Sequence, residues 1–421
     1  MQACNGVLGT KGITYDLKVW KVILKKAGLA GKYSMIKYRE DWPVPEIRHA
    51  RQIKVKTRIA GICTSDIHQI NVNLPYSASI LARKENPFPM GHELVGEVVE
   101  VGDQAGDFSI GDRVVHSPLA ACESYGFAPC PSCKNGNYET CYALVGLGDG
   151  TDLEDRYGGR GGFGGFSGGG FSEYFVGFAK QFTKVPSSLP DEIGVLSEPF
   201  AVGLHAVARN RPGDKDKILV IGGGIIGLMI VASLRALGSK CRIITIAKYG
   251  FQAEAAKKLG SDDVITERSH DRLYERVTEM TDGALFRPTI GKRILYGDSG
   301  PDVVFDAVGT DSTLDDALHL VRSNGRVVIV GMGFGKTKAT DWALQLYKQL
   351  SITGSMMHGV EQIEGKRTDT MELALTAMED APDVFRSLLT HKFRIEDYKA
   401  AFKCSEQKAR GNAIKVAFDF R

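Results

Sequence analysis

The feature that most constrains the fold is an apolar run at residues 218–234, ILVIGGGIIGLMIVASL, which a cluster of glycines divides in two. The part before the glycines is short and β-branched, as in a buried strand, and the part after them has the length of a helix. Although the run approaches the length of a membrane span, the glycines interrupt it. We therefore interpret it as a strand, a tight turn and a helix.

Strands and helices continue to alternate from about residue 202 to residue 356. Further apolar strands are expected in CRIITIA (241–247), DVVFDAVG (302–309) and GRVVIVGM (325–332), with helices in QAEAAKKLG and STLDDALHLVRS between them. The strands lack polar alternation, which is typical of a parallel sheet covered on both faces. We predict an α/β domain with a doubly wound parallel sheet over residues 202–356.

The rest of the chain predicts a second domain, because 421 residues exceed what one compact core usually contains. The first 201 residues are rich in glycine, proline and short β-type runs such as 52–62 and 94–102, which indicates an irregular β domain. Residues 357–421 return to mixed helix and strand. We expect residues 1–201 and 357–421 to form one domain, with the α/β domain inserted.

Composition excludes several broad classes of partner. The net charge is +3, and the basic residues are scattered rather than gathered into a stripe, so neither nucleic acid nor a membrane is expected as a partner. No apolar segment of signal-peptide length lies at the start, which predicts a cytoplasmic protein. Of the eight cysteines, four lie between 122 and 141, and in this setting they indicate a metal more than disulfides.

The glycine cluster carries a dinucleotide-binding pattern. Gly222, Gly224 and Gly227 form G-x-G-x-x-G directly after a strand and at the start of a helix. The first glycine permits the tight turn, the second lets the backbone approach a pyrophosphate, and the third allows close helix–strand packing. An ordinary loop is the alternative for such a triplet when it stands alone. Further cofactor contacts are expected at Ile225, Ile226, Val308, Gly309, Val330 and Gly331.

The end of the second strand bears on which nicotinamide cofactor binds. NAD-specific sites usually place an Asp or Glu there to hold the ribose hydroxyls. Here the strand ends at Ala247, followed by Lys248 and Tyr249, so a cation replaces the carboxylate. NADP(H) is therefore favoured over NAD(H). The alternative is that Lys248 is merely solvated.

Two segments and one glutamate supply the donors of a candidate catalytic metal site. They are Cys63, Ser65, Asp66 and His68 in GICTSDIH, His92 and Glu93 in GHE, and Glu198 before Pro199. A catalytic zinc needs a few sulfur, nitrogen or carboxylate ligands and one open position. Each residue alone is as well explained by a structural role, since a lone cysteine is often a small buried hydrophobe. Together they predict a catalytic zinc site.

A second set of cysteines predicts a structural metal. Cys122, Cys130, Cys133 and Cys141 lie within CESYGFAPCPSCKNGNYETC, and the Cys130–Cys133 spacing is the strongest part of the pattern. Four thiolates make a closed tetrahedral zinc site that stabilises a loop. Unrelated free thiols are the alternative.

With these motifs in this order, the chain resembles the zinc-containing medium-chain dehydrogenases/reductases of the alcohol dehydrogenase superfamily. It is most similar to the branch of sorbitol, threonine and polyol dehydrogenases, which carry the Glu-Pro pair seen at 198–199. The similarity begins at about residue 19 and includes GHELVGEVVEVG, GGFSEYF and SEPFAVGLHA. It implies a GroES-like catalytic domain joined to a Rossmann domain.

The resemblance also implies roles for the site residues. Cys63 and His92 would be zinc ligands, Glu93 or Glu198 would complete the shell directly or through water, and Asp66 would steady the site. Ser65 and His68 would relay a proton outward. The implied reaction interconverts a small secondary alcohol or polyol and its carbonyl compound by hydride transfer with NAD(P). A homodimer or homotetramer is implied as well.

The chain departs from the family pattern in three places. Phe127 stands where the first structural cysteine is usual, so Cys122 is the expected substitute, and residues 157–170 and 285–299 are expected to be surface insertions. Two other functions stay open: a zinc-independent quinone or enoyl reductase, and a noncatalytic dinucleotide-binding protein. The sequence does not name the substrate.

Overall fold

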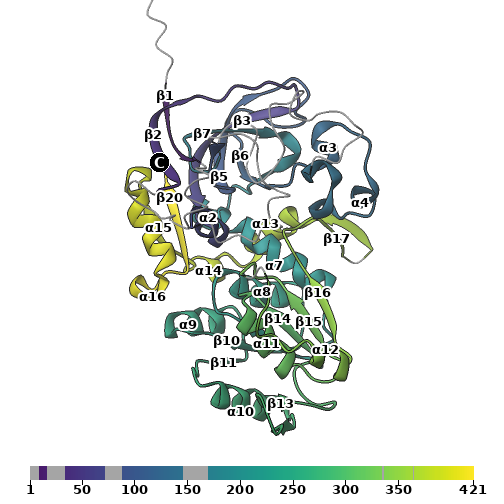
Figure 1. Cartoon of the computed structure of the whole chain (residues 1–421). Coiled ribbons are helices and arrows are strands. Elements are labelled where there is room, and N and C mark those ends of the chain that lie inside the picture. The colour runs from purple at the N-terminus through teal and green to yellow at the C-terminus, as the bar shows by residue number, and fades with distance from the viewer. Residues whose placement is uncertain (1–8, 17–33, 72–87, 146–168, 334–335, 364) are drawn as a thin grey trace, which may run out of the picture. The chain divides into compact units, whose positions relative to one another are not determined.

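The computed structural model describes residues 9–16, 34–71, 88–145, 169–333, 336–363 and 365–421 (Figure 1). The chain forms two compact units, Met1–Glu198 with Met378–Arg421 (unit 1) and Pro199–Ala377 (unit 2). Residues 357–377 therefore belong to unit 2, whereas the sequence interpretation places them in the first domain. One contact that joins this segment to the rest of unit 2 is buried: Glu361 Oε1 lies 2.5 Å from His205 Nδ1.

Unit 2 is built on a six-stranded parallel sheet, which confirms the predicted doubly wound fold. The strands are β9 (Lys217–Ile221), β10 (Arg242–Ile246), β11 (Asp263–Ile265), β14 (Val303–Asp306), β15 (Arg326–Ile329) and β16 (Ser351–Gly354). Their spatial order is β11-β10-β9-β14-β15-β16. The order therefore reverses between β9 and β14, and in such sheets ligands bind at the carboxyl ends of the strands at this point.

Helices follow the strands of unit 2 and cover its sheet (Figure 1). They are α8 (Ile225–Ala236), α9 (Gly250–Lys258), α10 (His270–Thr281), α11 (Asp311–Leu320) and α12 (Ala343–Tyr347), with α7 (Ser197–Arg209) and α13 (Thr370–Asp380) at the passages between units. The strands Val360–Ile363 (β17) and Lys366–Asp369 (β18) form a hairpin. Among the described residues, no helix has both the length and the apolar character needed to cross a membrane.

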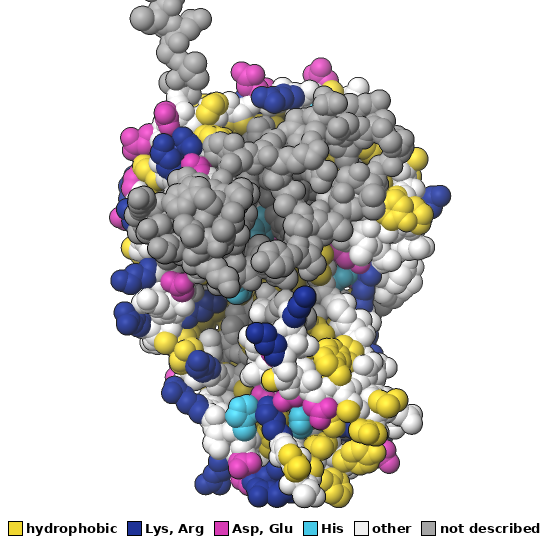
Figure 2. Space-filling model, viewed as in Figure 1, with side chains coloured by type: hydrophobic (Ala, Val, Ile, Leu, Met, Phe, Trp, Pro, Cys, Tyr) yellow, Lys and Arg dark blue, Asp and Glu magenta, His cyan; other side chains and the backbone are white. Residues whose placement is uncertain are grey.

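The predicted insertion at 285–299 forms a small surface hairpin of β12 (Leu285–Phe286) and β13 (Ile294–Leu295). Its side chains Phe286 and Ile290 are exposed. Lys292 attaches the hairpin to α11 through Asp315, at 2.7 Å. Figure 2 shows cationic, anionic and apolar side chains interspersed on this face of the described chain. The other predicted insertion, 157–170, lies outside the described residues except for its last two.

Unit 1 contains a mostly antiparallel sheet with the order β19-β20-β3-β5-β6-β8, and β7 also pairs with β3. These strands are β3 (Gln52–Gly61), β5 (Glu93–Val101), β6 (Arg113–His116), β7 (Tyr174–Phe178), β8 (Phe182–Lys184), β19 (Leu389–Phe393) and β20 (Lys415–Asp419). A smaller sheet consists of β1 (Gly9–Tyr15), β2 (Ile36–Pro43) and β4 (Phe88–Pro89). The pairings of β1 with β2 and of β3 with β5 contain register shifts, which agrees with the predicted irregular β domain.

The helices of unit 1 are short and lie between its strands. They are α2 (Thr64–Ile70), α3 (Cys122–Tyr125), α4 (Pro131–Lys134), α6 (Asp191–Gly194), α14 (Pro382–Phe385), α15 (Tyr398–Glu406) and α16 (Lys408–Gly411), with 3-10 turns at 138–140, 142–145, 179–181 and 395–397. Packed aromatic rings form much of the core, with Phe171, Phe402 and Phe418 in edge-to-face contact. These three side chains are fully buried.

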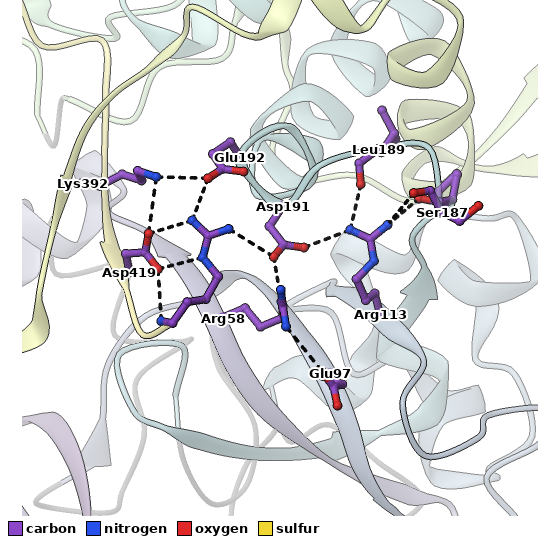
Figure 3. Close-up of polar contacts among 11 residues, drawn as sticks. Arg58, Glu97, Arg113, Ser187, Leu189, Asp191, Glu192, Lys392 and Asp419 are labelled. Carbon is purple, nitrogen blue, oxygen red and sulfur yellow. Dashed lines mark hydrogen bonds and ion pairs between the residues drawn. The ribbon is translucent and has the colours of Figure 1, made fainter.

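An ion-pair network joins four parts of unit 1 (Figure 3). The buried carboxylate of Asp191 on α6 accepts hydrogen bonds from Arg58 of β3 at 2.7 Å and from Arg113 of β6 at 3.0 Å. The last residue, Arg421, reaches Asp419 and Glu192 at 2.8 and 2.7 Å. The network therefore attaches the C-terminus of the chain to the sheet that carries the candidate site.

Candidate active site

The first candidate ligand, Cys63, lies where β3 gives way to α2. It is the N-cap residue of α2, and its backbone N–H donates to Asp66 Oδ2 at 2.9 Å. This hydrogen bond satisfies one of the free N–H groups at the start of the helix. Asp66 is almost completely buried, so the capping carboxylate is held inside the unit rather than in solvent.

The second and third candidates, His92 and Glu93, stand at the start of β5. Gly91 before them has φ +91°, and a Cβ atom there would lie 2.6 Å from a ring carbon of Phe171. Glycine is thus required for the turn that brings the chain into β5. The register of β3 and β5 then pairs Glu93 with Gly61, close to Cys63 in the chain.

The tertiary structure brings Cys63, His92 and Glu93 into one group, in which one ligand atom from each lies within 4.8 Å of the others. His92 and Glu93 are buried. Asp66 Oδ1 lies 3.7 Å from His92 Nδ1, the position of a carboxylate that orients an imidazole ligand. Sulfur, nitrogen and carboxylate oxygen together form a donor set that fits zinc and leaves a fourth position open.

Glu198, the second residue of α7, is buried but falls outside that 4.8 Å group. Burial first, and then the charge of Glu93, raise the pKa of Glu198 to about 7. Burial lowers the pKa of His92, but Asp66 and Cys63 raise it more, so that it lies well above its ordinary value. These shifts describe a buried site with closely spaced carboxylates and a histidine, which a cation would stabilise.

Ser65 and His68 both lie on α2 and are half-buried. They are three residues apart, a spacing that places side chains on the same face of a helix. Burial lowers the pKa of His68, and the charge of Lys408 lowers it further. The arrangement suits the predicted relay, which stays a prediction.

The four clustered cysteines form the second group, with their sulfur atoms within 4.8 Å of one another. Cys122 belongs to this group, and its Sγ lies 3.5 Å from Cys141 Sγ. Phe127, which occupies the usual ligand place, instead stacks on Tyr125 with ring centroids 5.4 Å apart. Cys122, the first residue of helix α3, is buried. The helix ends at Gly126, whose φ of +74° turns the chain.

The thiols of this group suit a tetrahedral zinc ion. None of the cysteines in the described residues is in a disulfide. Burial raises the pKa of Cys130, but the backbone N–H groups of Tyr142 and Cys133 outweigh it and bring the pKa to about 6. Burial raises the pKa of Cys141 to about 11. Burial also raises the pKa of Cys133, so a metal ion is the natural counter-charge for the thiolates of Cys133 and Cys141.

In unit 2, the glycine motif has the geometry that a dinucleotide requires. Gly222 follows β9 with φ +109°, and a Cβ on Gly227 would lie 1.8 Å from Gly222 O, so neither position accepts a side chain. Gly224 is the N-cap of α8, and open space surrounds it on the side where a Cβ would project. A pyrophosphate could therefore approach the backbone and the N-terminus of α8 there.

The predicted contacts after β14 and β15 lie against each other beside this motif. A Cβ on Gly309 would meet Gly331 O at 2.0 Å, and one on Gly222 would meet Val308 Cγ2 at 2.6 Å. Val308 is 38% exposed, which leaves an apolar surface at the carboxyl ends of the strands. The remaining predicted contacts lie at the same edge of the sheet. Helix α8 begins with Ile225 and Ile226, and Val330 follows β15 directly.

Strand β10 ends at Ile246, so Ala247, Lys248 and Tyr249 follow it directly. Ala247 is buried, and a Cβ on Gly223 would lie 2.8 Å from the Ala247 Cβ. Lys248 is exposed, and its ammonium lies 5.7 Å from the centre of the Tyr249 ring. The ring of Tyr249 stacks on Phe251 at 5.6 Å. A cation and an aromatic face thus stand where an NAD-type carboxylate is usual.

Sequence reasoning missed two buried charged residues. Asp306 at the end of β14 accepts hydrogen bonds from the backbone N–H groups of Val308 and Gly309 at 3.0 and 2.9 Å. Lys415 in β20 is 1% exposed and forms an ion pair with Glu93. A lone charge inside the apolar segments VVFDAVG and AIKVAF was the available signal for each.

Comparison with known families agrees with the fold. Residues 49–187 match the family described as "Alcohol dehydrogenase GroES-like domain". Residues 226–374 match the family described as "Zinc-binding dehydrogenase". The first match contains Cys63, His92, Glu93 and the four clustered cysteines, and the second contains Gly227 and the strands β10 to β16.

Individual relatives extend this agreement over most of the chain. It is 32% identical to a sorbitol dehydrogenase of Bacillus subtilis (strain 168), over 70% of this chain and 71% of that protein. It is 27% identical to an L-idonate 5-dehydrogenase of Vitis vinifera, with 87% of each covered. A galactitol-1-phosphate dehydrogenase from Escherichia coli has the same fold, with 23% identity and a TM-score of 0.70 over 97% of this chain and 99% of that one. The chain therefore belongs to the zinc-containing alcohol dehydrogenases of the medium-chain dehydrogenase/reductase family.

Proposed function

We propose that this enzyme is a zinc-dependent dehydrogenase that interconverts a polyol or secondary alcohol and its carbonyl compound, with NADP(H) as the preferred cofactor. The observation that carries the proposal is the buried group of Cys63, His92 and Glu93, with Asp66 beside His92. A quinone or enoyl reductase without zinc has no use for such a donor set. The sorbitol and L-idonate dehydrogenases among the relatives support a polyol as the substrate.

The residues of unit 1 would hold and prepare the site. Cys63, His92 and Glu93 would bind the metal, and Asp66 would keep the His92 ring in orientation. When bound, zinc would supply a Lewis acid for the substrate oxygen, and the dinucleotide would exchange hydride with the carbinol carbon. Ser65 Oγ would accept the proton of the substrate hydroxyl and pass it toward His68. Burial lowers the pKa of His68, which favours the neutral imidazole, the form with a free nitrogen for the proton.

The proposal also covers the choice of cofactor, the compartment and the oligomeric state. Lys248 and the absence of a carboxylate at Ala247 favour a 2′-phosphate, and thus NADP(H). The cysteines among the described residues form no disulfide bonds, which suits a reducing compartment such as the cytoplasm. A homodimer or homotetramer is proposed from the family resemblance alone.

The test combines metal analysis with a substrate panel. Purified protein is mixed with secondary alcohols and polyols and with NAD or NADP, and formation of the reduced cofactor is followed by its absorbance. We expect turnover with a polyol, faster with NADP, and loss of turnover together with catalytic zinc in Cys63→Ala.

Cys404→Ala is the matched control, because Cys404 is also a half-buried cysteine of unit 1. It should keep both zinc and activity. Turnover that survives in Cys63→Ala, or after complete removal of metal, would refute the zinc mechanism. Dinucleotide binding without turnover of any alcohol would favour the noncatalytic alternative.

A further inference from the structure

His116 is a buried histidine of unit 1 to which the proposed mechanism gives no role. It is the last residue of β6, and its side chain is fully buried. Its ring packs edge-to-face against Phe175 and also contacts Phe182, with ring centroids 4.7 and 5.3 Å away. An imidazole enclosed by apolar rings is costly unless its nitrogens find hydrogen-bond partners. The identity of those partners therefore indicates what the residue does.

The partner of one ring nitrogen belongs to a candidate metal ligand. His116 Nδ1 lies 3.1 Å from the backbone oxygen of His92. A carbonyl oxygen can only accept a hydrogen bond, so the ring of His116 must carry a hydrogen on Nδ1 and donate it. His116 is thereby bonded to the main chain of His92, on β6, a strand that carries none of the candidate ligands Cys63, His92 and Glu93.

The surroundings of the other ring nitrogen select the same tautomer. Gln181 Nε2 lies 3.5 Å from His116 Nε2 and donates to Ser117 O at 3.3 Å, while Gln181 Oε1 accepts the backbone N–H of Phe178 at 3.1 Å. These two backbone contacts assign the amide oxygen and nitrogen of Gln181, so its NH₂ group faces the ring. His116 Nε2 therefore accepts, and the hydrogen lies on Nδ1.

The contact lies where the backbone pairing of the sheet stops. The described ladder between β5 and β6 ends at Val95 of β5, so the carbonyl of His92 lies beyond it. Before His92, the backbone N–H of Gly170 donates to Gly91 O at 3.1 Å. The chain is thus held by a neighbouring segment just before the ligand and by the side chain of His116 at the ligand itself.

We propose that His116 is a positioning residue, which holds the main chain of His92 so that the His92 imidazole meets the metal in one orientation. Asp66 lies 3.7 Å from the ring of His92 and would hold the ring, so the ligand would be fixed at two points. The inference rests on the proposed zinc site. Groups that orient a metal ligand without touching the metal commonly change its affinity by tenfold to about 100-fold when they are lost.

The test uses the full-length enzyme with cobalt(II) in place of the catalytic zinc, because the visible spectrum of cobalt reports the geometry of its ligands. His116→Phe keeps a buried ring but has no donor for His92. We expect this variant to bind zinc about tenfold more weakly in competition with a chromophoric chelator, and to shift the visible bands of cobalt. Unchanged zinc affinity and unchanged cobalt bands would show that the role of His116 is structural only, and the proposal would be wrong.

Two amide variants test the hydrogen bond itself, and they keep the proposal testable if His116→Phe does not fold. The amide nitrogen of asparagine is bonded to Cγ, as Nδ1 of histidine is, whereas that of glutamine lies one atom farther along the side chain. His116→Asn should therefore retain the cobalt bands of the wild type, and His116→Gln should show the shifted bands. Identical metal binding in the two variants would contradict a donor at the Nδ1 position.

His319 of unit 2 supplies the matched control. It is 4% exposed, and its Nδ1 lies 2.8 Å from the backbone oxygen of Asp315, so His319→Phe removes the same kind of hydrogen bond far from the candidate ligands in the sequence. We expect it to lower the midpoint of thermal unfolding but to leave zinc affinity and the cobalt bands unchanged. If His319→Phe weakens catalytic zinc as much as His116→Phe does, general destabilisation is the cause and the proposal fails.

The proposed function fails in a different way from this inference. If the wild type binds no catalytic metal, or if Cys63→Ala retains it, the proposed zinc site itself is wrong. If the wild type binds zinc through Cys63 and the His116 variants bind it equally well, only the role of His116 is wrong.

Discussion

The carboxylate of Asp66 lies 3.7 Å from the imidazole Nδ1 of His92, and both side chains are almost fully buried. Because Asp66 also accepts the backbone N–H of Cys63, it contacts two of the three candidate ligands. We expect Asp66→Asn to keep the helix cap but to lose the charge that orients His92, and to weaken zinc binding about tenfold. Asp66→Ala, which loses both contacts, should weaken it about 100-fold.

Competition with a chromophoric chelator measures this affinity, and Asp103→Asn at an exposed position of unit 1 is the control. Equal zinc affinity in Asp66→Asn and the wild type would show that the carboxylate does not support the site.

The second prediction concerns the choice of cofactor. Replacing Lys248 by Glu puts a carboxylate at the end of β10, which should repel a 2′-phosphate and accept the ribose hydroxyls of NAD. We expect KM for NADP to rise by roughly tenfold, about 1.4 kcal/mol, with little change for NAD. Steady-state kinetics with both cofactors measure the ratio. Lys240→Glu, at an exposed position before β10, controls for net charge. A parallel change in both KM values would contradict a specific role.

The third prediction concerns the unusual first ligand of the cysteine group. Cys122→Ser should remove about one equivalent of zinc per chain and lower the midpoint of thermal unfolding, because three thiolates and a weak hydroxyl hold the metal poorly. Elemental analysis and thermal unfolding measure the two effects. Cys241→Ser, at a buried cysteine outside the group, should retain all its zinc. Full zinc content in Cys122→Ser would mean that Cys122 is not the substitute for the usual ligand.

The fourth prediction is a pH dependence of stability from the network in Figure 3. Arg421 holds the pKa of Asp419 at about 2, and also lowers that of Glu192 to about 2 against the opposing effect of burial. A depressed carboxylate pKa stabilises the folded state above the unfolded pKa. That stability is lost as the pH falls from about 5 toward 2.

Arg421→Gln should therefore destabilise the chain by ~1–2 kcal/mol at pH 7, a figure reduced for the partial exposure of these groups, and by roughly half as much at pH 3. Urea unfolding at the two pH values gives the difference. Arg410→Gln, at an exposed arginine, should show no such dependence. A destabilisation by Arg421→Gln that is the same at both pH values would exclude the carboxylates as its source.

Local patterns made the nucleotide-binding unit and the ligand types predictable. Gly222 and Gly227 lie within a few residues of one turn and one helix start. Their spacing in the sequence therefore predicts the geometry of the turn. The pair Cys130 and Cys133 is local in the same way, since one short helix presents both. In such features, residues that are close in the sequence are also close in space.

The sequence by itself therefore determined the doubly wound fold, the zinc-type donor sets and the family. Only the tertiary structure decided that Glu93 joins Cys63 and His92, that Cys122 joins the other cysteines, and that Lys415 contacts Glu93 across Gly61. The physical reason is sheet register. Strands far apart in the chain meet through β3, and a shift of one residue would turn the side chains of Glu93 and Lys415 to the opposite face. Cys122 lies on helix α3, so it joins the other cysteines through the path of the loops between the strands.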